Sequence, residues 1–342
     1  MTAVFLENPS SLGHETGGHP EQPARLIAIE HELEKHGWLG FDRVSSPAIS
    51  REALTAVHPE RHVAAIERFC EAGGGHLDLD TIASRESFEA ALHSAGGAAR
   101  MVELLLAGEA SVGFSCHRPP GHHATADRAM GFCLFNNVAV AGVHALKHGG
   151  LSRVMIVDWD VHHGNGTDDI FHSDDRVLFV SIHQSPLYPG TGPAQDVGSG
   201  PGEGYTVNLP VAAGTGDDEY RSLVEHVAVP LAVAFAPQLL LISAGYDAHR
   251  EDPLGGCEVT EAGFAAMTRS LRAVAGELEA PLGAVLEGGY ALDALARSVA
   301  TTMQALAAPE SRRSGNQAQD LRLAPVALAA RQRLARWWPA LS

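Results

Sequence analysis

The sequence predicts an α/β protein built on a central parallel β-sheet with helices on both faces. Short apolar segments alternate with longer segments of helical periodicity along most of the chain. This alternation is typical of parallel strands joined by crossover helices. The strand segments hold few polar residues, as expected for a sheet covered on both sides. We therefore expect one domain over residues 1–308, followed over 309–342 by a linker and a C-terminal helix that packs on the same domain.

Four helices and three strands are expected in the first part of the chain. Glycines follow several of the helical segments, at Gly37, at 73–75 and at Gly108, where glycine commonly ends a helix. The strands are expected at residues 4–6, 111–115 and 154–157, and the helices at 24–36, 60–72, 86–107 and 136–147.

The second part of the chain continues the same alternation. One long helix is expected there despite Pro230, and the tail is expected to form an amphipathic helix whose Trp337 and Trp338 pack back on the body. The strands are expected at residues 176–182, 205–209, 238–243 and 282–286, the helices at 217–235, 260–277, 292–307 and 325–338, and a polar linker at 309–320.

The segment RVMIVDWDVHHGNG, residues 153–166, places acids and histidines directly after a buried strand. Such residues are costly to bury unless they are paired or bind a cation. Residues two apart in an extended segment point the same way, so Asp158, Asp160 and His162 share one side. A carboxylate and an imidazole converging there can serve as two ligands of a divalent metal. A loop with an internally satisfied Asp–His pair fits this segment equally well.

Polar residues follow other strands too, and the carboxyl ends of parallel strands form the ligand-binding edge of an open α/β sheet. Asp247, after the strand at 238–243, is the natural third ligand beside Asp160 and His162. Three protein ligands and one open position are the layout of a catalytic zinc site, and Fe²⁺ is the alternative metal. Because two carboxylates neutralise the charge of the metal, its chemistry would need help from a base and an electrophile.

The sequence supplies candidates for both. His122 and His123 follow the strand at 111–115, and Asp158 and Asn165 are available to fix their tautomers. We expect His123 to take the proton from the attacking water and pass one to the leaving amine, while His122 stays protonated; exchanged roles fit equally well. Tyr290 follows two glycines, which let the backbone turn its phenol toward a developing oxyanion.

Composition narrows the choice of partners and compartment. The formal charge of −17 argues against general nucleic-acid binding; it favours a soluble surface and is compatible with basic substrates. No secretory leader or apolar stretch of about 18 residues is present, so neither secretion nor a membrane span is expected. Four scattered cysteines without CxxC spacing suggest reduced thiols in a cytoplasmic protein.

Seven motifs occur in a characteristic order. They are HPEQPAR (19–25), RPPGHHA (118–124), GFCLFNN (131–137), DWDVHHGNGT (158–167), VSIHQSPLYPGTG (180–192), AGYDAHREDPLGGCEVT (244–260) and EGGY (287–290). Together they resemble the zinc-dependent histone deacetylase family, closest to its class II branch and the bacterial histone deacetylase-like amidohydrolases, over residues 4 to 307. The resemblance implies the arginase/deacetylase fold and hydrolysis of acetyl-lysine in a peptide or protein, or of a small acylated amine.

The same resemblance implies roles for individual residues. Zinc would be held by Asp160, His162 and Asp247, beside the paired histidines and Tyr290. A narrow acyl-lysine channel would be lined by Gly131, Phe132 and Tyr188, with Leu254 at its mouth, and Arg25 would lie near an acetate exit path.

Two structural potassium ions are also implied by the resemblance. One would be held near the zinc, largely by backbone oxygens, at Asp158, Asp160, His162 and Ser181. The other would be held by carbonyl groups around Phe171, Asp174, Val177 and Tyr205.

Departures from the family pattern bear on the substrate. Asn165 is the class II residue, so the partner of His123 is a neutral amide. The related acetylpolyamine amidohydrolases carry a long insertion between residues 72 and 80 and an acidic residue where this chain has Leu254, so lysine is favoured over a polyamine. The alternatives are an acetylpolyamine amidohydrolase and a non-catalytic acyl-lysine binding module. A two-metal ureohydrolase of the arginase type is disfavoured, because Gly164, Ala248 and His249 stand where it would need further carboxylates.

Overall fold

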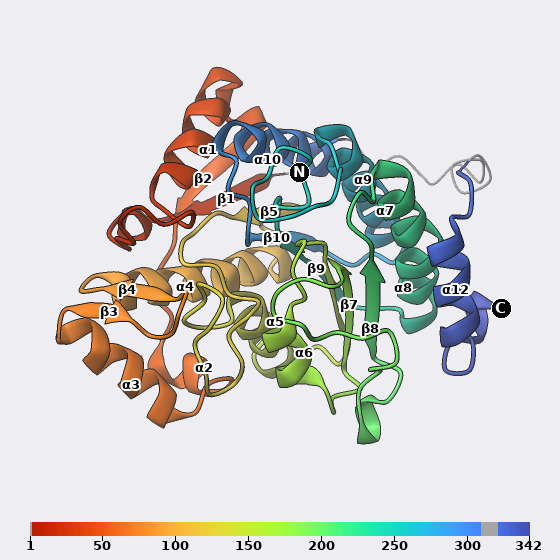
Figure 1. Cartoon of the computed structure of the whole chain (residues 1–342), viewed down its shortest axis with the longest axis horizontal. Helices are drawn as coiled ribbons and strands as arrows, with labels where there is room; N and C mark the ends of the chain where they lie inside the picture. The colour runs from red at the N-terminus through yellow and green to blue at the C-terminus, as the bar shows by residue number, and fades with distance from the viewer. Residues whose placement is uncertain (1, 309–320) are drawn as a thin grey trace.

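A computed structural model of the chain describes residues 2–308 and 321–342, and the expected linker at 309–320 lies outside the described residues. Its centre is an eight-stranded sheet with every pairing parallel and the order β2-β1-β5-β10-β9-β6-β7-β8 (Figure 1). The predicted α/β fold is confirmed. The strands are β1 Ala3–Glu7, β2 Phe41–Ser45, β5 Val112–Ser115, β6 Val154–Asp158, β7 Val177–Gln184, β8 Thr206–Val211, β9 Leu239–Ala244 and β10 Leu282–Leu286.

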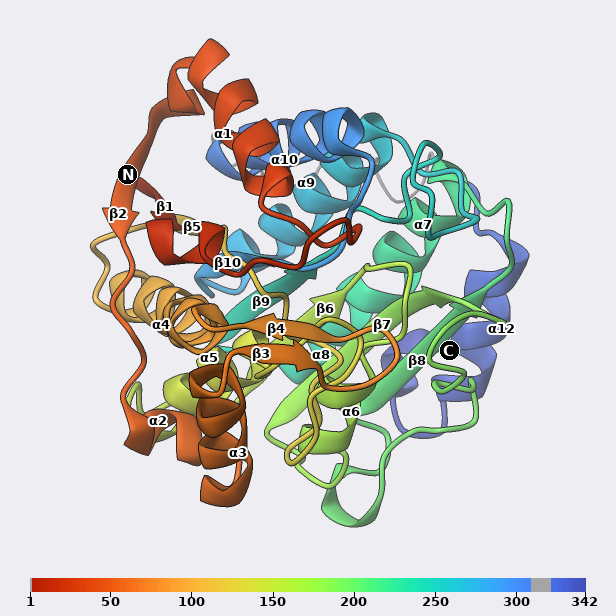
Figure 2. The same cartoon turned by 60° about the vertical axis from the view of Figure 1, so that its left-hand side comes forward.

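Helices cover both faces of the sheet (Figures 1 and 2). One layer contains α1 (Ala24–Lys35), α7 (Asp217–Leu223), α8 (Val229–Phe235), α9 (Glu261–Glu277) and α10 (Leu292–Ala307). The other contains α4 (Ser87–Leu106), α5 (Asn137–Lys147) and α6 (Asn165–Phe171), with α2 (Arg51–Thr55) and α3 (Glu60–Glu71) packed outside it.

The buried strands contribute side chains to two hydrophobic cores, one on each face of the sheet. Along β6, Met155 and Val157 pack with the α1–α9–α10 layer, whereas Val154 and Ile156 pack with α4 and α5. This alternation follows from the two-residue period of a strand. Because both faces are apolar, the strands read in the sequence as continuous hydrophobic runs.

Several short elements were not predicted. They are β2, the helices α2 and α6, the β3–β4 hairpin (Gly74–His76 and Ile82–Ser84), and the 3-10 helices η1 (Pro9–Leu12), η2 (Gly37–Gly40), η3 (Gly200–Gly202) and η5 (Pro339–Leu341). The strand β2 lies at the edge of the sheet, and its Asp42 and Arg43 are exposed, so it lacks an apolar run. The remaining elements are too short to show a clear period.

The predicted helix at 217–235 is interrupted by a π-helical turn, η4 (Val224–Ala228), immediately before Pro230. Proline has no N–H to offer the carbonyl four residues earlier, which here belongs to His226. That carbonyl instead accepts a hydrogen bond from Nη1 of Arg331, at 3.4 Å. A wider turn and an external donor therefore accommodate the proline inside a nearly continuous helix.

Arg331 belongs to the C-terminal helix α12 (Pro325–Leu334), which is shorter than the predicted 325–338. Its Ala327, Ala330 and Leu334 are buried in the main core. Beyond the helix, the indole N–H of Trp338 donates to the carbonyl of Gly204, at 2.7 Å. No helix among the described residues is long and apolar enough to span a lipid bilayer.

The strand order decides which loops meet. The strands β5, β10, β9 and β6 are consecutive neighbours in the sheet, although β10 is the last of them along the chain. Since all run parallel, the segments that follow them emerge side by side at the carboxyl edge. These segments carry the histidine pair, Tyr290, Asp247 and the Asp160–His162 pair, respectively.

A fully buried ion network fastens the N-terminal segment to this edge. Glu21 receives hydrogen bonds from Nη2 of Arg118 at 2.7 Å and Nη1 of Arg25 at 3.2 Å, and His14 Nε2 lies 3.3 Å away. Burial alone would raise the pKa of Glu21, but the charge of Arg118 and the contact with His14 hold it well below its usual range. Two guanidinium groups thus share one carboxylate.

Replacing Glu21 by Gln should strongly destabilise the fold, because it leaves Arg25 and Arg118 buried without their counter-charge. We expect a loss of about 3–5 kcal/mol in the free energy of unfolding, measured by denaturant titration. The control is Glu32→Gln, which removes the surface pair with Lys35 and should change the stability by less than about 1 kcal/mol. Equal effects of the two substitutions would contradict this assignment.

Candidate active site

Three buried side chains converge at the carboxyl edge of the sheet. Asp160 and His162 come from the loop after β6, and Asp247 from the loop after β9. Nδ1 of His162 lies 3.1 Å from Oδ1 of Asp160 and 3.0 Å from Oδ2 of Asp247. One donor atom of each residue lies within 4.8 Å of the others, so the three side chains can bind one ion. The expected juxtaposition of these residues is present.

The composition and packing of this cluster fit a divalent cation. Burial, together with the charge of Asp160, raises the pKa of Asp247 to about 7. This rise reflects the electrostatic cost of placing two buried carboxylates next to each other. A Cβ at Gly245 would overlap Oδ2 of Asp160, and one at Gly288 would overlap Oδ2 of Asp247, so the two glycines make room for the carboxylates. Two carboxylates and one imidazole are ligands suited to Zn²⁺ or Fe²⁺.

The two adjacent histidines have different partners. Nδ1 of His122 lies 3.0 Å from Oδ2 of Asp158, and its Nε2 lies 3.8 Å from Oδ1 of Asp160. Nδ1 of His123 lies 2.8 Å from the amide oxygen of Asn165. Because that oxygen can only accept, Nδ1 of His123 carries the proton and Nε2 keeps its lone pair.

These partners separate the basicities of the two rings. Burial opposes protonation of His122, but the charges of Asp160 and Asp158 raise its pKa well above the usual value. Burial lowers the pKa of His123 well below the usual value, and the charge of His122, whose ring centroid is 4.0 Å away, lowers it further. His122 is therefore the more basic of the two rings, and His123 the less basic.

Tyr290 lies between an aromatic ring and a buried cation. Its ring meets that of Phe132 edge-on at 5.7 Å, and the guanidinium of Arg25 lies 5.0 Å from its centroid. Nε of Arg25 also donates to the carbonyl of Gly289, at 2.6 Å. Burial raises the pKa of the phenol well above its usual range, against the opposing charge of Arg25. Tyr290 is consequently a neutral hydrogen-bond donor.

Two of the predicted channel residues, Gly131 and Tyr188, contact His123. Gly131 packs against its ring with a φ of +57°, and a Cβ there would overlap the imidazole. Phe132 follows with a φ of +70°, and Tyr188 meets the ring of His123 edge-on at 5.2 Å. The ring of Tyr188 is 37% exposed, so the cluster opens to solvent on that side. Leu254 is half-buried on the loop that carries Asp247.

Both sets of residues predicted to hold potassium lie along the β6–β7–β8 part of the sheet. In the first set, Asp158 and Ser181 are partners across β6 and β7. In the second, Phe171, Asp174 and Val177 lie close together in the turn from α6 to β7. The N–H of Asp174 donates to the carbonyl of Phe171 at 2.9 Å, and the N–H of Val177 donates to the carbonyl of Asp174 at 3.4 Å. The carbonyl of Tyr205 accepts from the N–H of Phe179 in β7 at 2.9 Å.

Glu287 is a buried residue of the site whose role was not predicted from the sequence. Its Oε2 accepts the N–H groups of Gly121 at 2.7 Å and His122 at 3.0 Å, and its Oε1 accepts from the hydroxyl of Ser243 at 2.9 Å. It is fully buried, and burial raises its pKa to about 7. An acid at the end of the apolar strand β10 was the available clue, but its partners lie far away in sequence.

A second Asp–His–Asp group, Asp168, His172 and Asp196, lies near α6. Nδ1 of His172 is 2.8 Å from Oδ1 of Asp168, whereas Nε2 is 3.7 Å from Oδ1 of Asp196. The two nitrogens of one ring thus face different carboxylates, and Asp168 raises the pKa of His172. His172 is thus hydrogen-bonded to one acid and lies close to a second.

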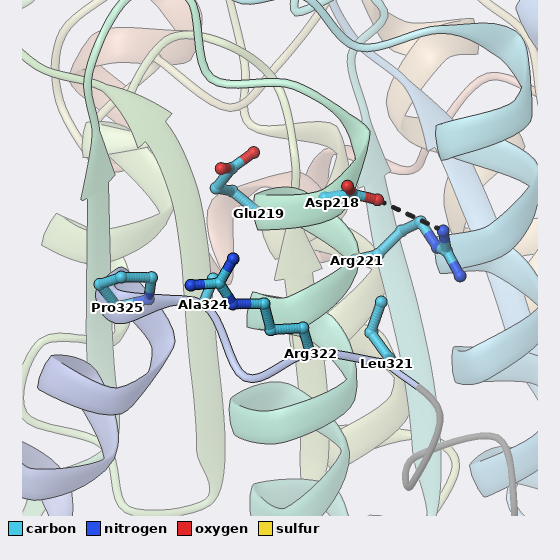
Figure 3. A pocket seen from close by; sticks show the side chains of 7 residues that line it. All are labelled: Asp218, Glu219, Arg221, Leu321, Arg322, Ala324 and Pro325. Atoms are coloured by element: carbon cyan, nitrogen blue, oxygen red, sulfur yellow. Dashed lines mark ion pairs between the residues drawn. The ribbon is translucent and has the colours of Figure 1, made fainter.

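A cavity of about 760 Å³ lies between α7 and the segment that leads into α12 (Figure 3). It contains an exposed ion pair, with Nη1 of Arg221 3.7 Å from Oδ1 of Asp218. None of its lining residues belongs to the predicted site. They are Asp218, Glu219, Arg221, Leu321, Arg322, Ala324 and Pro325.

Comparisons with known proteins match this chain to one family. The model of the histone deacetylase domain matches residues 19–306. Histone deacetylase 15 of Arabidopsis thaliana is 42% identical over 294 residues, which cover 84% of this chain and 52% of that protein. The histone deacetylase-like amidohydrolase of Pseudomonas aeruginosa is 39% identical over 276 residues, covering 80% of this chain and 73% of that protein.

A probable deacetylase of Archaeoglobus fulgidus is 42% identical over 298 residues, covering 86% of this chain and 82% of that protein. The crystal structure of the HDA15 HD domain superimposes with a TM-score of 0.90 and 37% identity, covering 99% of this chain and 96% of that one. The chain spans about half the length of the Arabidopsis relative, histone deacetylase 15. With the fold, the ordered motifs and these matches in agreement, the chain belongs to the histone deacetylase family.

Proposed function

We propose that this protein is a metal-dependent amidohydrolase that removes acetyl or related short acyl groups from the ε-amine of lysine. The observation that carries the proposal is the convergence of the Asp160–His162–Asp247 cluster with two neighbouring histidines that have different hydrogen-bond partners, the carboxylate of Asp158 and the amide of Asn165. Amide hydrolysis needs a site for an electrophile, a base and an acid within one small volume. The relatives named as deacetylases and amidohydrolases support the same reaction class.

The metal expected at this cluster is Zn²⁺, with Fe²⁺ as the alternative. A divalent ion there would supply Lewis-acid polarisation of the amide carbonyl and a lowered pKa for water. Asp160, His162 and Asp247 would hold it, and one coordination position would stay open because the protein offers three ligands.

The histidines would divide the proton transfers. His123 takes a proton from the attacking water at Nε2, since its Nδ1 is committed to Asn165. It then delivers a proton to the nitrogen of the leaving lysine amine. His122 remains an imidazolium held by Asp158, and its charge stabilises the negative charge that develops on the substrate.

Tyr290 would donate its phenol proton in a hydrogen bond to the carbonyl oxygen as that oxygen becomes negative. Gly131, Phe132 and Tyr188 would line the acyl-lysine channel, and Leu254 would lie at its mouth. Arg25, which is buried behind Tyr290, would border the acetate exit. Potassium ions would be held by the two sets of residues described along β6, β7 and β8, as structural ions.

Acetate release from an acetyl-lysine peptide, with and without a chelator, tests this function. We expect turnover that the chelator abolishes and added Zn²⁺ restores, and faster turnover of the peptide than of acetylputrescine. A series of lysine peptides with longer acyl groups measures the length that the channel accepts. If metal-loaded protein binds the peptide without releasing acetate, it is a binding module; faster turnover of acetylputrescine would make it a polyamine enzyme.

Replacing Asp247 by Ala should remove the metal and the activity while leaving a folded protein, because one of three ligands is lost. Metal content after dialysis and the thermal unfolding curve measure the two effects. The matched control is Asp175→Ala, which removes an exposed acid and should retain both metal and turnover. Stoichiometric metal in the Asp247 variant would exclude this residue as a ligand.

Replacing Tyr290 by Phe should lower kcat by roughly 10²–10³-fold, the typical effect of losing an oxyanion donor. KM and metal content should stay near the wild-type values, since the ring and its contacts with Phe132 and Arg25 remain. Steady-state kinetics on metal-loaded protein measure the effect. Unchanged turnover would remove the assigned role of the phenol.

A further inference from the structure

The loop after β9 carries a second buried acid, Asp252, five residues beyond Asp247. Its side chain is 8% exposed. Oδ2 of Asp252 accepts the N–H groups of Tyr290 at 2.6 Å and Ala291 at 3.1 Å, and Oδ1 accepts the N–H of Leu254 at 3.0 Å. One carboxylate therefore binds both its own loop and the loop of the tyrosine.

The loop that carries Tyr290 is held on its other side by the guanidinium group of Arg25. Arg25 donates from Nε to the carbonyl of Gly289 at 2.6 Å and from Nη2 to the carbonyl of Glu287 at 2.5 Å. The carbonyl groups before Tyr290 are thus bound by a guanidinium, and its own N–H is bound by a carboxylate. Gly289 between them has a φ of +117°, so this turn departs from regular backbone geometry and depends on such external contacts.

Asp252 is also anchored to the loop of the metal ligand. Its N–H donates to the carbonyl of His249 at 2.8 Å, two residues after Asp247. A shift of Asp252 would consequently change the position of the phenol relative to the metal cluster. Displacement of a reacting group by about 1 Å can lower a rate by about 10²-fold.

We propose that Asp252 is a positioning residue that fixes Tyr290 relative to Asp247 and the metal cluster. The inference rests on the proposed amide hydrolysis and adds a residue that acts through the phenol without touching the substrate. The chemistry demands a carboxylate, because all three partners of its two oxygens are N–H donors. An asparagine at this position would place its side-chain NH₂ group against at least one of these backbone N–H groups.

The direct test is Asp252→Asn in metal-loaded protein, with an acetyl-lysine peptide as substrate. We expect kcat to fall about ten- to a hundredfold because the phenol is displaced, while KM changes less than threefold and the metal content is retained. Asp252→Glu, which restores two accepting oxygens, should recover part of kcat. The matched control is the adjacent acid Glu251, which pairs with Arg297 on the surface: Glu251→Gln should keep wild-type kinetics.

A double-mutant cycle separates positioning from a general structural role. In the Tyr290→Phe background, Asp252→Asn should lower kcat less than about threefold further, since residues that act through one group are not additive. An equal fold-loss in both backgrounds, or loss of metal from the Asp252→Asn protein, would overturn the proposal. If Asp252→Asn fails to fold, Asp252→Glu is measured in the same cycle.

Amide hydrogen exchange tests the contact without relying on turnover. In the metal-free wild type, the segment containing Tyr290 and Ala291 should exchange slowly, because both N–H groups are bonded to Asp252. Asp252→Asn should accelerate exchange in this segment at least tenfold and leave other segments unchanged. Unchanged exchange would refute the inference, whereas faster exchange in a protein that never releases acetate would refute only the proposed hydrolysis.

Discussion

Four carboxylates at or just beyond the ends of β6, β9 and β10 have no exposed surface, and much of the surrounding structure compensates their charge. They are Asp158, Asp160, Asp247 and Glu287, all fully buried. A charged group is buried only when paired, hydrogen-bonded or bound to a metal, and each of these satisfies that condition differently. Asp158 pairs with His122, Glu287 binds backbone N–H groups, and Asp160 and Asp247 face one another across His162. The negative charge of Asp160 and Asp247 is therefore the charge that a bound cation would neutralise.

Backbone amides also contribute to this compensation. The N–H of Gly288 donates to Asp160 at 2.8 Å, and the N–H of Val161 donates to Asp247 at 2.8 Å. At the start of α6, the N–H groups of Gly166 and Thr167 bind the carbonyl of His122. These contacts fix the ligand and histidine loops relative to one another. The geometry of the site therefore depends on the sheet order that brings the loops together.

The sequence was sufficient for the fold class and for the candidate residues, because both depend on local patterns. Apolar runs identify strands such as β6 and β9, and the acids and histidines after them are visible as exceptions. The order of the strands was not predictable in this way, since the insertion of β10 between β5 and β9 is decided by contacts between distant segments. The same reason explains why Glu287 and Asp252 were missed: their partners are main-chain N–H groups, 165 residues away for the pair Glu287–His122 and 38 for Asp252–Tyr290. Edge strand β2 and the π-helical turn before Pro230 lacked any local pattern of their own.

The absence of side chains at Gly245 and Gly288 limits how the candidate metal site can be changed by protein engineering. Each glycine lies against the carboxylate of a candidate ligand, so even one added methyl group would push that ligand out of place. Redesign of the proposed metal preference consequently has to exchange the candidate ligands themselves, because substitutions at Gly245 or Gly288 would displace them. Tyr188 is exposed and Leu254 is half-buried, so if the proposed function holds, selectivity for new acyl groups is best sought at these two positions.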